Sequence, residues 1–502
     1  MSERKIGAIL SYLNVILQMV VSFLYIPLLL YYISREEYGL YQLIGSLIAY
    51  LSVMDFGLSN MVIRFYAKYL TLEDDEGAEN ILAIARRGYM LFCLLVLLAG
   101  GIFYQFLPMW FGNSMTEAEL TEGMAIYVLL LFNFVITMLG MVYQASIDAR
   151  QRFLFLRGTS CLQIILQPLL VVVVLQEYPN ALGVAVATTI INVLFTLWRW
   201  AYANWRLRIR IVYHYWNREL LQGVGYFMLM QSIVAVADLI FFKTNQIILG
   251  IISGTAAVAL YAIAASIQQN YMMMSLSISG VFLPHVTELV TRKVDSDELF
   301  SLFIRIGRLQ FFVLGLVSSG FVIFGREFIT LWAGEGFKDS YLITLLIILP
   351  FTTDLIQNIG FTILQAMNRY GIRAAVLTIM GIVNIALAIP LGMRYGGIGC
   401  AAASGLCMLL GNCLGMSYCY VRYLHFQMMK FWRQILLIFG RLALLTAVIY
   451  GINCFLPEMG SVFLAVKIVI YTGIYGIVAY VCCFNDYERM LCVGWLRKKI
   501  AD

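Results

Sequence analysis

Apolar stretches of roughly twenty residues, separated by short polar connections, follow one another along almost the whole chain. A helix of about twenty residues spans the hydrocarbon core of a bilayer, which is about 30 Å thick, so each stretch is predicted to be a transmembrane helix. We count fourteen stretches, centred near Val20, Ser52, Val96, Phe134, Ile165, Val193, Val234, Ser275, Val317, Leu355, Ile382, Leu409, Leu445 and Tyr471. The predicted fold class is therefore an all-α polytopic membrane protein with 14 transmembrane helices.

Polar residues inside these stretches form two matching trios. The first trio is Asn133, Thr137 and Gln144, and a shift of 221 residues places it on Asp354, Asn358 and Gln365. The spacing i, i+4, i+11 puts each trio on one face of a helix with 3.6 residues per turn. The match indicates an internal duplication.

The length of the shift predicts how the two copies are arranged. It contains six predicted helices, an even number, so both copies enter the membrane in the same orientation. We predict two parallel six-helix repeats, an N-lobe of residues 1–215 and a C-lobe of residues 216–430, around a central cavity. Residues 431–502 would add two extra C-terminal helices and a cytoplasmic tail. The alternative is that the duplication is old and the cavity has been filled.

Two further predicted helices carry polar stripes. The first helix has Asn14, Gln18 and Tyr25, and the seventh has Gln231, Asp238 and Asn245. Each stripe falls within about 20–40° of one helix face, at about 100° per residue. Amides can also bond neighbouring helices in a dry bundle, but comparable stripes in both repeats favour a hydrated interior.

Composition and charge agree with a membrane protein. The chain is 62% hydrophobic and 12% charged, against about 45–50% and about 25% in soluble domains. Positive charge is retained on the cytoplasmic side, and all of the 34 Lys and Arg residues lie at the N-terminus or on even-numbered connections except Arg35, Lys243, Arg326, Lys338, Arg394 and Lys467. This alternation predicts a multi-pass protein of the cytoplasmic membrane with both termini in the cytoplasm. The net charge of +6 is interpreted as contact with anionic lipid head groups, not with nucleic acid.

The connections and the cysteines argue against catalysis. No connection is long enough to fold as a catalytic domain, so the chain is not predicted to be an enzyme. Nine of the ten cysteines lie in or beside apolar helices and the other in the C-terminal tail, and the three histidines are isolated, so no metal site is expected. No organic cofactor is expected either.

Charged residues inside a membrane are costly and are functional candidates. Asp354 lies near the middle of its predicted helix, and Asp238 and Asp55 lie further along theirs. We predict that one of these carboxylates couples a proton or a sodium ion to transport. Arg64 and Lys243, and less directly Arg35, are candidates for binding an anion, although Arg64 and Lys243 lie close enough to helix ends to reach the interface instead.

Several short segments resemble one family. They are Met-Asp-Phe-Gly-Leu-Ser-Asn at 54–60, Asn-Gln-Ile-Ile-Leu-Gly at 245–250, Glu-Tyr-Gly-Leu-Tyr at 37–41 and Phe-Leu-Pro at 282–284. Their order and spacing resemble the bacterial polysaccharide flippases of the multidrug/oligosaccharidyl-lipid/polysaccharide exporter superfamily, over essentially the whole chain. The resemblance implies flipping of an undecaprenyl-pyrophosphate-linked oligosaccharide, an O-antigen or capsule repeat unit, from the cytoplasmic to the periplasmic leaflet by alternating access.

The resemblance also implies partners and roles. Cavity residues would contact the lipid-linked oligosaccharide, with Arg64, Lys243 and Arg35 on the pyrophosphate; the polar candidates are Asn14, Gln18, Tyr25, Asn133, Asn358 and Gln365. Membrane lipids, a polysaccharide polymerase and its chain-length machinery are the expected partners of a monomer.

Four other functions are considered. Drug exporters of the same superfamily typically have twelve helices, and lipid II flippases are expected to carry several cavity arginines in the first lobe. A major-facilitator sugar transporter would need a Gly-x-x-x-Asp-Arg-type loop between Lys68 and Ala85, where none is present. A membrane-embedded polymerase or scaffold would not move a labelled lipid-linked sugar between leaflets.

Overall fold

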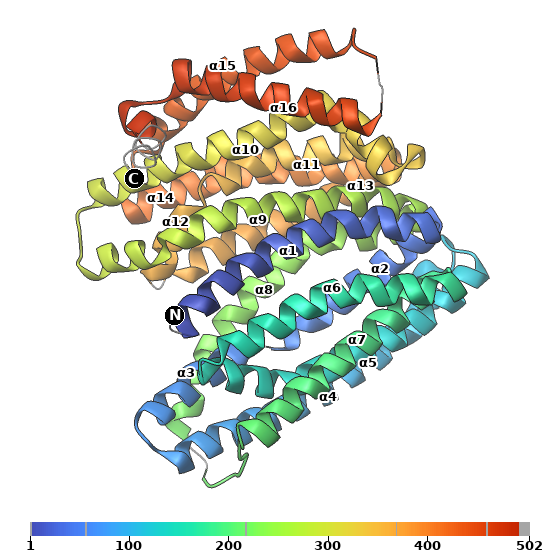
Figure 1. Cartoon of the computed structure of the whole chain (residues 1–502), viewed down its shortest axis with the longest axis vertical. Helices are drawn as coiled ribbons and strands as arrows, with labels where there is room; N and C mark the ends of the chain where they lie inside the picture. Colours follow the sequence, from blue (N-terminus) through green and yellow to red (C-terminus); the bar gives the residue numbers. More distant parts are fainter. Residues whose placement is uncertain (1–2, 56–57, 216–217, 368, 458–459, 491–502) are drawn as a thin grey trace. The chain divides into compact units, whose positions relative to one another are not determined.

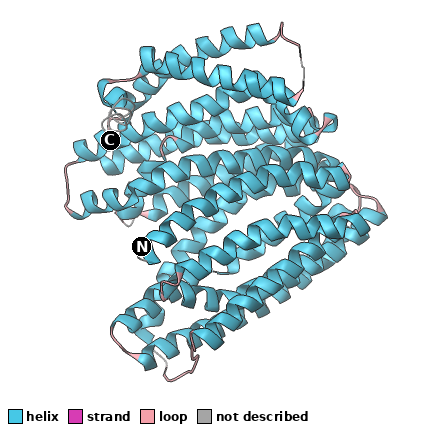
Figure 2. Cartoon of the chain, viewed as in Figure 1, coloured by secondary structure: helices cyan, strands magenta, loops and turns pink. Residues whose placement is uncertain are grey.

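The computed structural model describes residues 3–55, 58–215, 218–367, 369–457 and 460–490. Within these ranges the regular secondary structure is helical and contains no strand (Figure 2). Eleven of the described helices are long and apolar enough to cross a membrane, and the number rises to twelve if α11 (Ser340–Leu355) and α12 (Asn358–Ala366) form one bent span. The protein is a multi-span, all-helical membrane protein.

The chain divides into two compact units. The first comprises residues 1–262 together with 377–400, and the second comprises residues 263–376 together with 401–502. Two helices, α9 (Thr255–Thr291) and α13 (Tyr370–Leu410), therefore contribute segments to both units.

The first unit is built mainly from the N-terminal half of the chain. Its helices are α1 (Glu3–Tyr32), α2 (Arg35–Leu51), α3 (Leu58–Thr71), α4 (Asp75–Phe111), α5 (Glu117–Ala149), α6 (Phe153–Glu177), α7 (Ala181–Ala201) and α8 (Arg218–Ser253). Side-chain caps fix several helix starts, because Ser34, Thr116 and Asn180 accept backbone N–H groups that have no partner inside the helix. Helices α5, α6 and α7 pack against one another, and α1 packs against α6 (Figure 1).

The second unit is organised around α10 (Ser296–Ala333). It also contains the C-terminal part of α13 with α14 (Ser417–Leu424), and α11, α12, α15 (Met428–Asn453) and α16 (Ser461–Val478). Helices α11, α15 and α16 all pack on α10.

Polar contacts join α10 to α16 and the segment that follows it. A buried ion pair links Lys467 Nζ to Glu327 Oε2 at 2.5 Å, and a second links Arg308 Nε to Glu488 Oε1 at 2.6 Å. Between them the hydroxyl of Tyr475 donates to the carbonyl of Phe312 at 3.0 Å. Buried ion pairs are costly to break because the remaining charge has no water, so α16 is fixed to α10 along its length.

Two of the predicted spans contain a helix break, and one further break separates two predicted spans. The span predicted near Ser52 is centred on a 3₁₀ turn, Ser52–Asp55, between α2 and α3. The spans predicted near Ile382 and Leu409 both lie in α13, which is interrupted at Gly396 with φ 58° and ψ −136°. Glycine tolerates this conformation because it has no Cβ.

The third break corrects the prediction that Asp354, Asn358 and Gln365 share one helix face. Asp354 lies at the end of α11, whereas Asn358 and Gln365 lie on α12, and the two helices are bent by 44°. At the break, the side-chain amide of Gln357 donates to the Thr353 carbonyl at 2.6 Å. A side chain that takes this carbonyl competes with the backbone ladder, which explains why the pattern failed here.

Candidate functional site

The first polar trio forms a network between α5 and α7. The amide Nδ2 of Asn192 on α7 donates to Asn133 Oδ1 at 2.5 Å and to Thr137 Oγ1 at 2.6 Å. The trio stays on one face of α5, as predicted, and this face is turned towards α7. Asn192 is not among the predicted site residues, although Thr188, Thr189, Thr196 and Arg199 stand at helical spacing from it.

The last member of that trio binds an arginine. Arg199 Nη1 on α7 donates to Gln144 Oε1 at 3.1 Å, and its Nη2 donates to Gln163 Oε1 of α6 at 2.9 Å. Arg199 is half-buried, and its Nε is buried without a hydrogen-bond partner. The alternation of positive charge predicts that Arg199 belongs to a cytoplasmic connection. The helical spacing from Asn192, seven residues earlier, is the signal that could have revealed it.

The stripe on α1 is directed at two neighbours. Asn14 Nδ2 lies 3.4 Å from the Arg157 carbonyl and 3.5 Å from Cys161 Sγ, both on α6. Tyr25 is half-buried and lies beside the Thr188 side chain of α7. Gln18 is exposed. The stripe therefore does not line a single polar surface.

The stripe on α8 includes a buried amide network. Asn245 Nδ2 donates to the Tyr261 hydroxyl at 2.9 Å, and Asn384 Nδ2 donates to Asn245 Oδ1 at 3.2 Å. Asp238 and Lys243 are half-buried, and Lys243 makes no ion pair with any residue that the structure describes. The side chain of Gln231 lies outside the described residues.

Asp354 is paired with an arginine that the sequence reasoning missed. Arg373 Nη2 on α13 lies 3.7 Å from Asp354 Oδ2, and the Arg373 guanidinium lies 4.2 Å from the centre of the Phe361 ring. The side chains of Arg373 and Asp354 are 18% and 15% exposed. A carboxylate beside a guanidinium has its charge compensated, so a cation would have to compete with Arg373 for Asp354.

A hydrogen-bond cluster supports the break beside Asp354. The hydroxyl of Ser275 donates to the Leu355 carbonyl at 3.0 Å and accepts from Asn358 Nδ2 at 3.0 Å. Gln310 Nε2 also donates to Ser275 Oγ, at 3.1 Å. These bonds satisfy polar groups that the broken helix would otherwise leave unpaired.

The remaining predicted site residues are more scattered. Arg64 is exposed, with its guanidinium 5.9 Å from the Phe65 ring centre, and Arg35 Nε donates to the Ala256 carbonyl at 3.2 Å. Gln365 is half-buried on α12. Asp55 ends the 3₁₀ turn, and its side chain lies outside the described residues.

An apolar groove of about 950 Å³ lies in the second unit between α10, α11, α15 and the C-terminal part of α13. Most of its lining is aliphatic or aromatic, including Phe311, Leu349, Leu409, Leu436 and Phe439. Several of these residues are also exposed. The groove is therefore open and suits a hydrocarbon chain.

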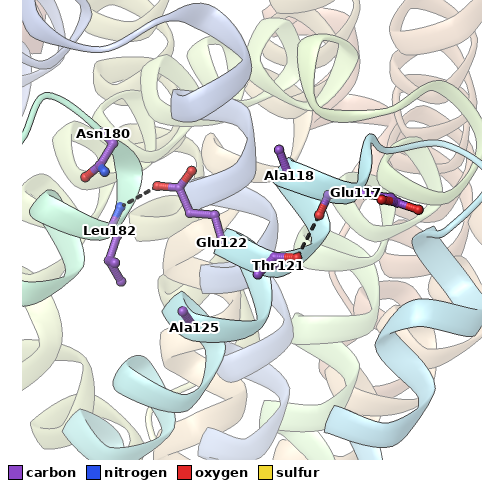
Figure 3. A pocket seen from close by; sticks show the side chains of 7 residues that line it. All are labelled: Glu117, Ala118, Thr121, Glu122, Ala125, Asn180 and Leu182. Carbon is purple, nitrogen blue, oxygen red and sulfur yellow. Dashed lines mark hydrogen bonds between the residues drawn. The ribbon is translucent and has the colours of Figure 1, made fainter.

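A second pocket, of about 570 Å³, lies between the start of α5 and the start of α7 (Figure 3). Glu122, one of its two acidic residues, accepts the backbone N–H of Leu182 at 3.1 Å, and Asn180 accepts that of Gly183 at 2.8 Å. Nearby, Glu37 accepts the N–H of Ala181 at 2.5 Å. These side chains are occupied in capping α7. The structure also holds no group of three metal-ligating side chains among the residues it describes.

Comparison with solved structures places the fold. The chain is similar to the lipid II flippase MurJ in an inward closed conformation, with a TM-score of 0.72 and 15% identity over 95% of this chain and 98% of the other. It is also similar to an inward-facing multidrug resistance MATE family transporter of the MOP superfamily, with a TM-score of 0.63 and 14% identity over 82% of this chain and 95% of the other. These two similarities show that the chain shares the fold of these membrane proteins.

Sequence comparison gives the family. A relative from Bacillus subtilis (strain 168), described as the uncharacterized membrane protein EpsK, is 23% identical over 413 residues, which cover 77% of each chain. The family model described as polysaccharide biosynthesis protein matches residues 6–290. The chain belongs to this family, which confirms the resemblance found in its motifs.

Proposed function

We propose that the protein is a flippase that moves an undecaprenyl-pyrophosphate-linked oligosaccharide repeat unit from the cytoplasmic to the periplasmic leaflet of the inner membrane by alternating access. The observation that carries the proposal is the similarity to a lipid II flippase over 95% of the chain, in a member of the polysaccharide biosynthesis protein family.

Physical chemistry sets two requirements for such a carrier. Moving a polar group of a pyrophosphate or a sugar from water into hydrocarbon costs several kcal/mol of free energy unless new hydrogen bonds replace those to water. The polar side chains between α5 and α7, including Asn133, Thr137 and Asn192, support the proposal because they offer such bonds. The isoprenoid tail needs an apolar path, and the groove of about 950 Å³ in the second unit fits that need.

The arrangement of the chain is part of the proposal. Two six-helix lobes, residues 1–215 and 216–430, would enclose the cavity, with two further helices in 431–502 and both termini in the cytoplasm. Asp354, Asp238 or Asp55 would couple a proton or a sodium ion to the cycle. For Asp354, protonation would release Arg373, since the pair loses its attraction when the carboxylate is neutral.

Reconstitution tests this function. The full-length protein is placed in liposomes that contain an undecaprenyl-pyrophosphate-linked oligosaccharide with a fluorescent label on the sugar, and a membrane-impermeant quencher is added outside. In protein-free vesicles only the outer-leaflet label is quenched, and a flippase exposes the inner-leaflet label as well. Quenching that stays at the protein-free level would reject the proposal and favour a scaffold or a polymerase.

Parallel vesicles separate the related transporters. The same protein is assayed with labelled lipid II and, separately, for efflux of a cationic dye. Movement of lipid II alone would identify a lipid II flippase, and dye efflux alone would identify a drug exporter. We expect movement of the repeat-unit lipid.

A further inference from the structure

Arg199 is an uncompensated charge held by neutral groups. Its two Nη atoms donate to the carboxamide oxygens of Gln144 and Gln163, at 3.1 and 2.9 Å. It makes no ion pair with any carboxylate in the described ranges. Charges in membrane helices are normally paired, so a half-buried guanidinium with only amide partners has a positive charge still to be neutralised.

The donors that remain define the kind of ligand. A guanidinium has five N–H groups, and the two glutamines use one on each Nη atom. The Nε–H is buried and has no partner within the protein. Each Nη atom keeps a second N–H, and such a pair of donors matches the oxygens of a phosphate, with which arginine forms two parallel hydrogen bonds.

The glutamines fix the direction of the guanidinium. They come from α5 and α6, which both pack on α7. Three helices therefore position this side chain, unlike the exposed Arg206 five residues beyond α7. A charge that only reached the interface would not need carboxamide acceptors from two other helices.

Arg199 lies near the end of a candidate membrane span, Ala181–Arg206. Arg199 lies seven residues before Arg206, which is about 10 Å at about 1.5 Å per residue. Trp198 and Trp200, 46% and 40% exposed, flank it, and exposed tryptophans gather at the membrane interface. In the proposed orientation this is the cytoplasmic side, where the substrate is loaded.

We infer that Arg199, held by Gln144 and Gln163, is the binding site for a lipid-attached phosphate, and that its ligand is the pyrophosphate of the transported lipid. The choice of ligand rests on the proposed function, whereas the phosphate site itself does not. The Asn133, Thr137 and Asn192 side chains continue the same polar seam along α5 and α7, where the saccharide would follow the pyrophosphate.

A binding experiment tests the site. The full-length protein in phosphatidylcholine nanodiscs is titrated with citronellyl pyrophosphate, a short isoprenyl pyrophosphate, by isothermal calorimetry. Arg199→Gln is expected to weaken binding about tenfold or more, the change produced by losing one charge-assisted hydrogen bond. Arg206→Gln is the matched control, because it removes one positive charge from the same end of the same chain segment, and it should bind like the wild type.

A second variant protects the test against misfolding. In Gln163→Glu the new side chain has nearly the same shape as glutamine and gives Arg199 a carboxylate partner. The variant should therefore fold well, and its affinity for citronellyl pyrophosphate should fall to the same extent as in Arg199→Gln. Equal losses in Arg199→Gln and Arg206→Gln would overturn the inference, since they would show a general surface-charge effect. Wild-type affinity in both Arg199→Gln and Gln163→Glu would overturn it as well.

Two further measurements separate the sources of the phosphate and the two proposals. If phosphatidylglycerol in the nanodiscs blocks the binding of citronellyl pyrophosphate at Arg199, this result would support the phosphate site but assign it to bilayer lipid. Wild-type protein that binds citronellyl pyrophosphate through Arg199 yet flips nothing would support the site and reject the proposed function. Normal flipping by an Arg199→Gln variant that has lost pyrophosphate binding would overturn the choice of the transported lipid as the ligand.

Discussion

Asp354→Ala tests whether the buried acid serves the transport cycle or only its neighbour. The substitution leaves the Arg373 guanidinium over Phe361 without its counter-ion at 3.7 Å. Two unit charges at this separation attract each other by about 4 kcal/mol at an effective dielectric constant of about 20. Removing one partner of a buried pair costs about 3–5 kcal/mol. Because the Asp354 and Arg373 side chains keep 15% and 18% exposure, we expect a loss of about 3 kcal/mol in the free energy of unfolding.

The double variant Asp354→Ala/Arg373→Met separates the two roles. Unfolding is followed in mixed dodecyl maltoside and dodecyl sulfate micelles, and transport is followed by the liposome quenching assay. The double variant should recover most of the stability, because no unpaired charge remains, and should stay inactive in transport. Wild-type transport by the double variant would refute the coupling role of Asp354. Wild-type stability of the single variant would show that water screens the pair.

Three further substitutions test a buried ion pair, a glycine backbone conformation and a candidate binding residue. Glu488→Gln should lower the free energy of unfolding by about 3 kcal/mol, because it leaves Arg308 unpaired. The double variant Arg308→Met/Glu488→Met should restore that free energy. Equal stability of the wild type, the single variant and the double variant would rule out a fixed attachment of α16. Gly396→Ala should lower the free energy of unfolding by about 1–3 kcal/mol, because only glycine readily adopts the backbone angles at this position. The control Gly336→Ala, at an open position without positive φ, should unfold like the wild type. Equal melting temperatures of the two variants would contradict this expectation. Arg64→Ala should weaken binding of citronellyl pyrophosphate in the nanodisc assay. Unchanged affinity would leave Arg64 as an interfacial charge.

The membrane class and the helical fold could be predicted from the sequence because their signals are local. Apolar length and the alternation of positive charge depend only on neighbouring residues and on the bilayer. Two of the helix breaks could not be predicted in this way. At Ser52–Asp55 and at Gln357 the surrounding stretch of about twenty residues is apolar on average, so hydropathy continues through the break. At the Gln357 break, side chains donate hydrogen bonds to the Thr353 and Leu355 carbonyls, and a hydropathy average does not detect such bonds. The interruption at Gly396, in contrast, falls between the two spans predicted near Ile382 and Leu409.

The polar trios show which features of the site helical periodicity can predict. Helical spacing correctly placed Asn133, Thr137 and Gln144 on one face of α5, and the partners on that face proved to be Asn192 and Arg199 of α7. Periodicity identifies a face but not the helix that covers it, because packing brings together residues distant in sequence. For the same reason Asp354 could be singled out as a buried acid while its partner Arg373 could not.

Arg199 and Arg373 were both missed for one physical reason. Each lies within a few turns of a helix end, where arginines also accumulate because the cytoplasmic side retains positive charge. A count of basic residues uses both arginines to orient the chain and so treats them as solvated. The distinguishing property is the set of groups around the guanidinium: two carboxamides for Arg199, and a carboxylate with an aromatic ring for Arg373. Neutral acceptors leave the positive charge of a guanidinium available to an anion, whereas a carboxylate neutralises that charge. The two arginines therefore differ in the charge that their partners leave uncompensated, although their positions relative to helix ends are alike, and only the tertiary structure separates them.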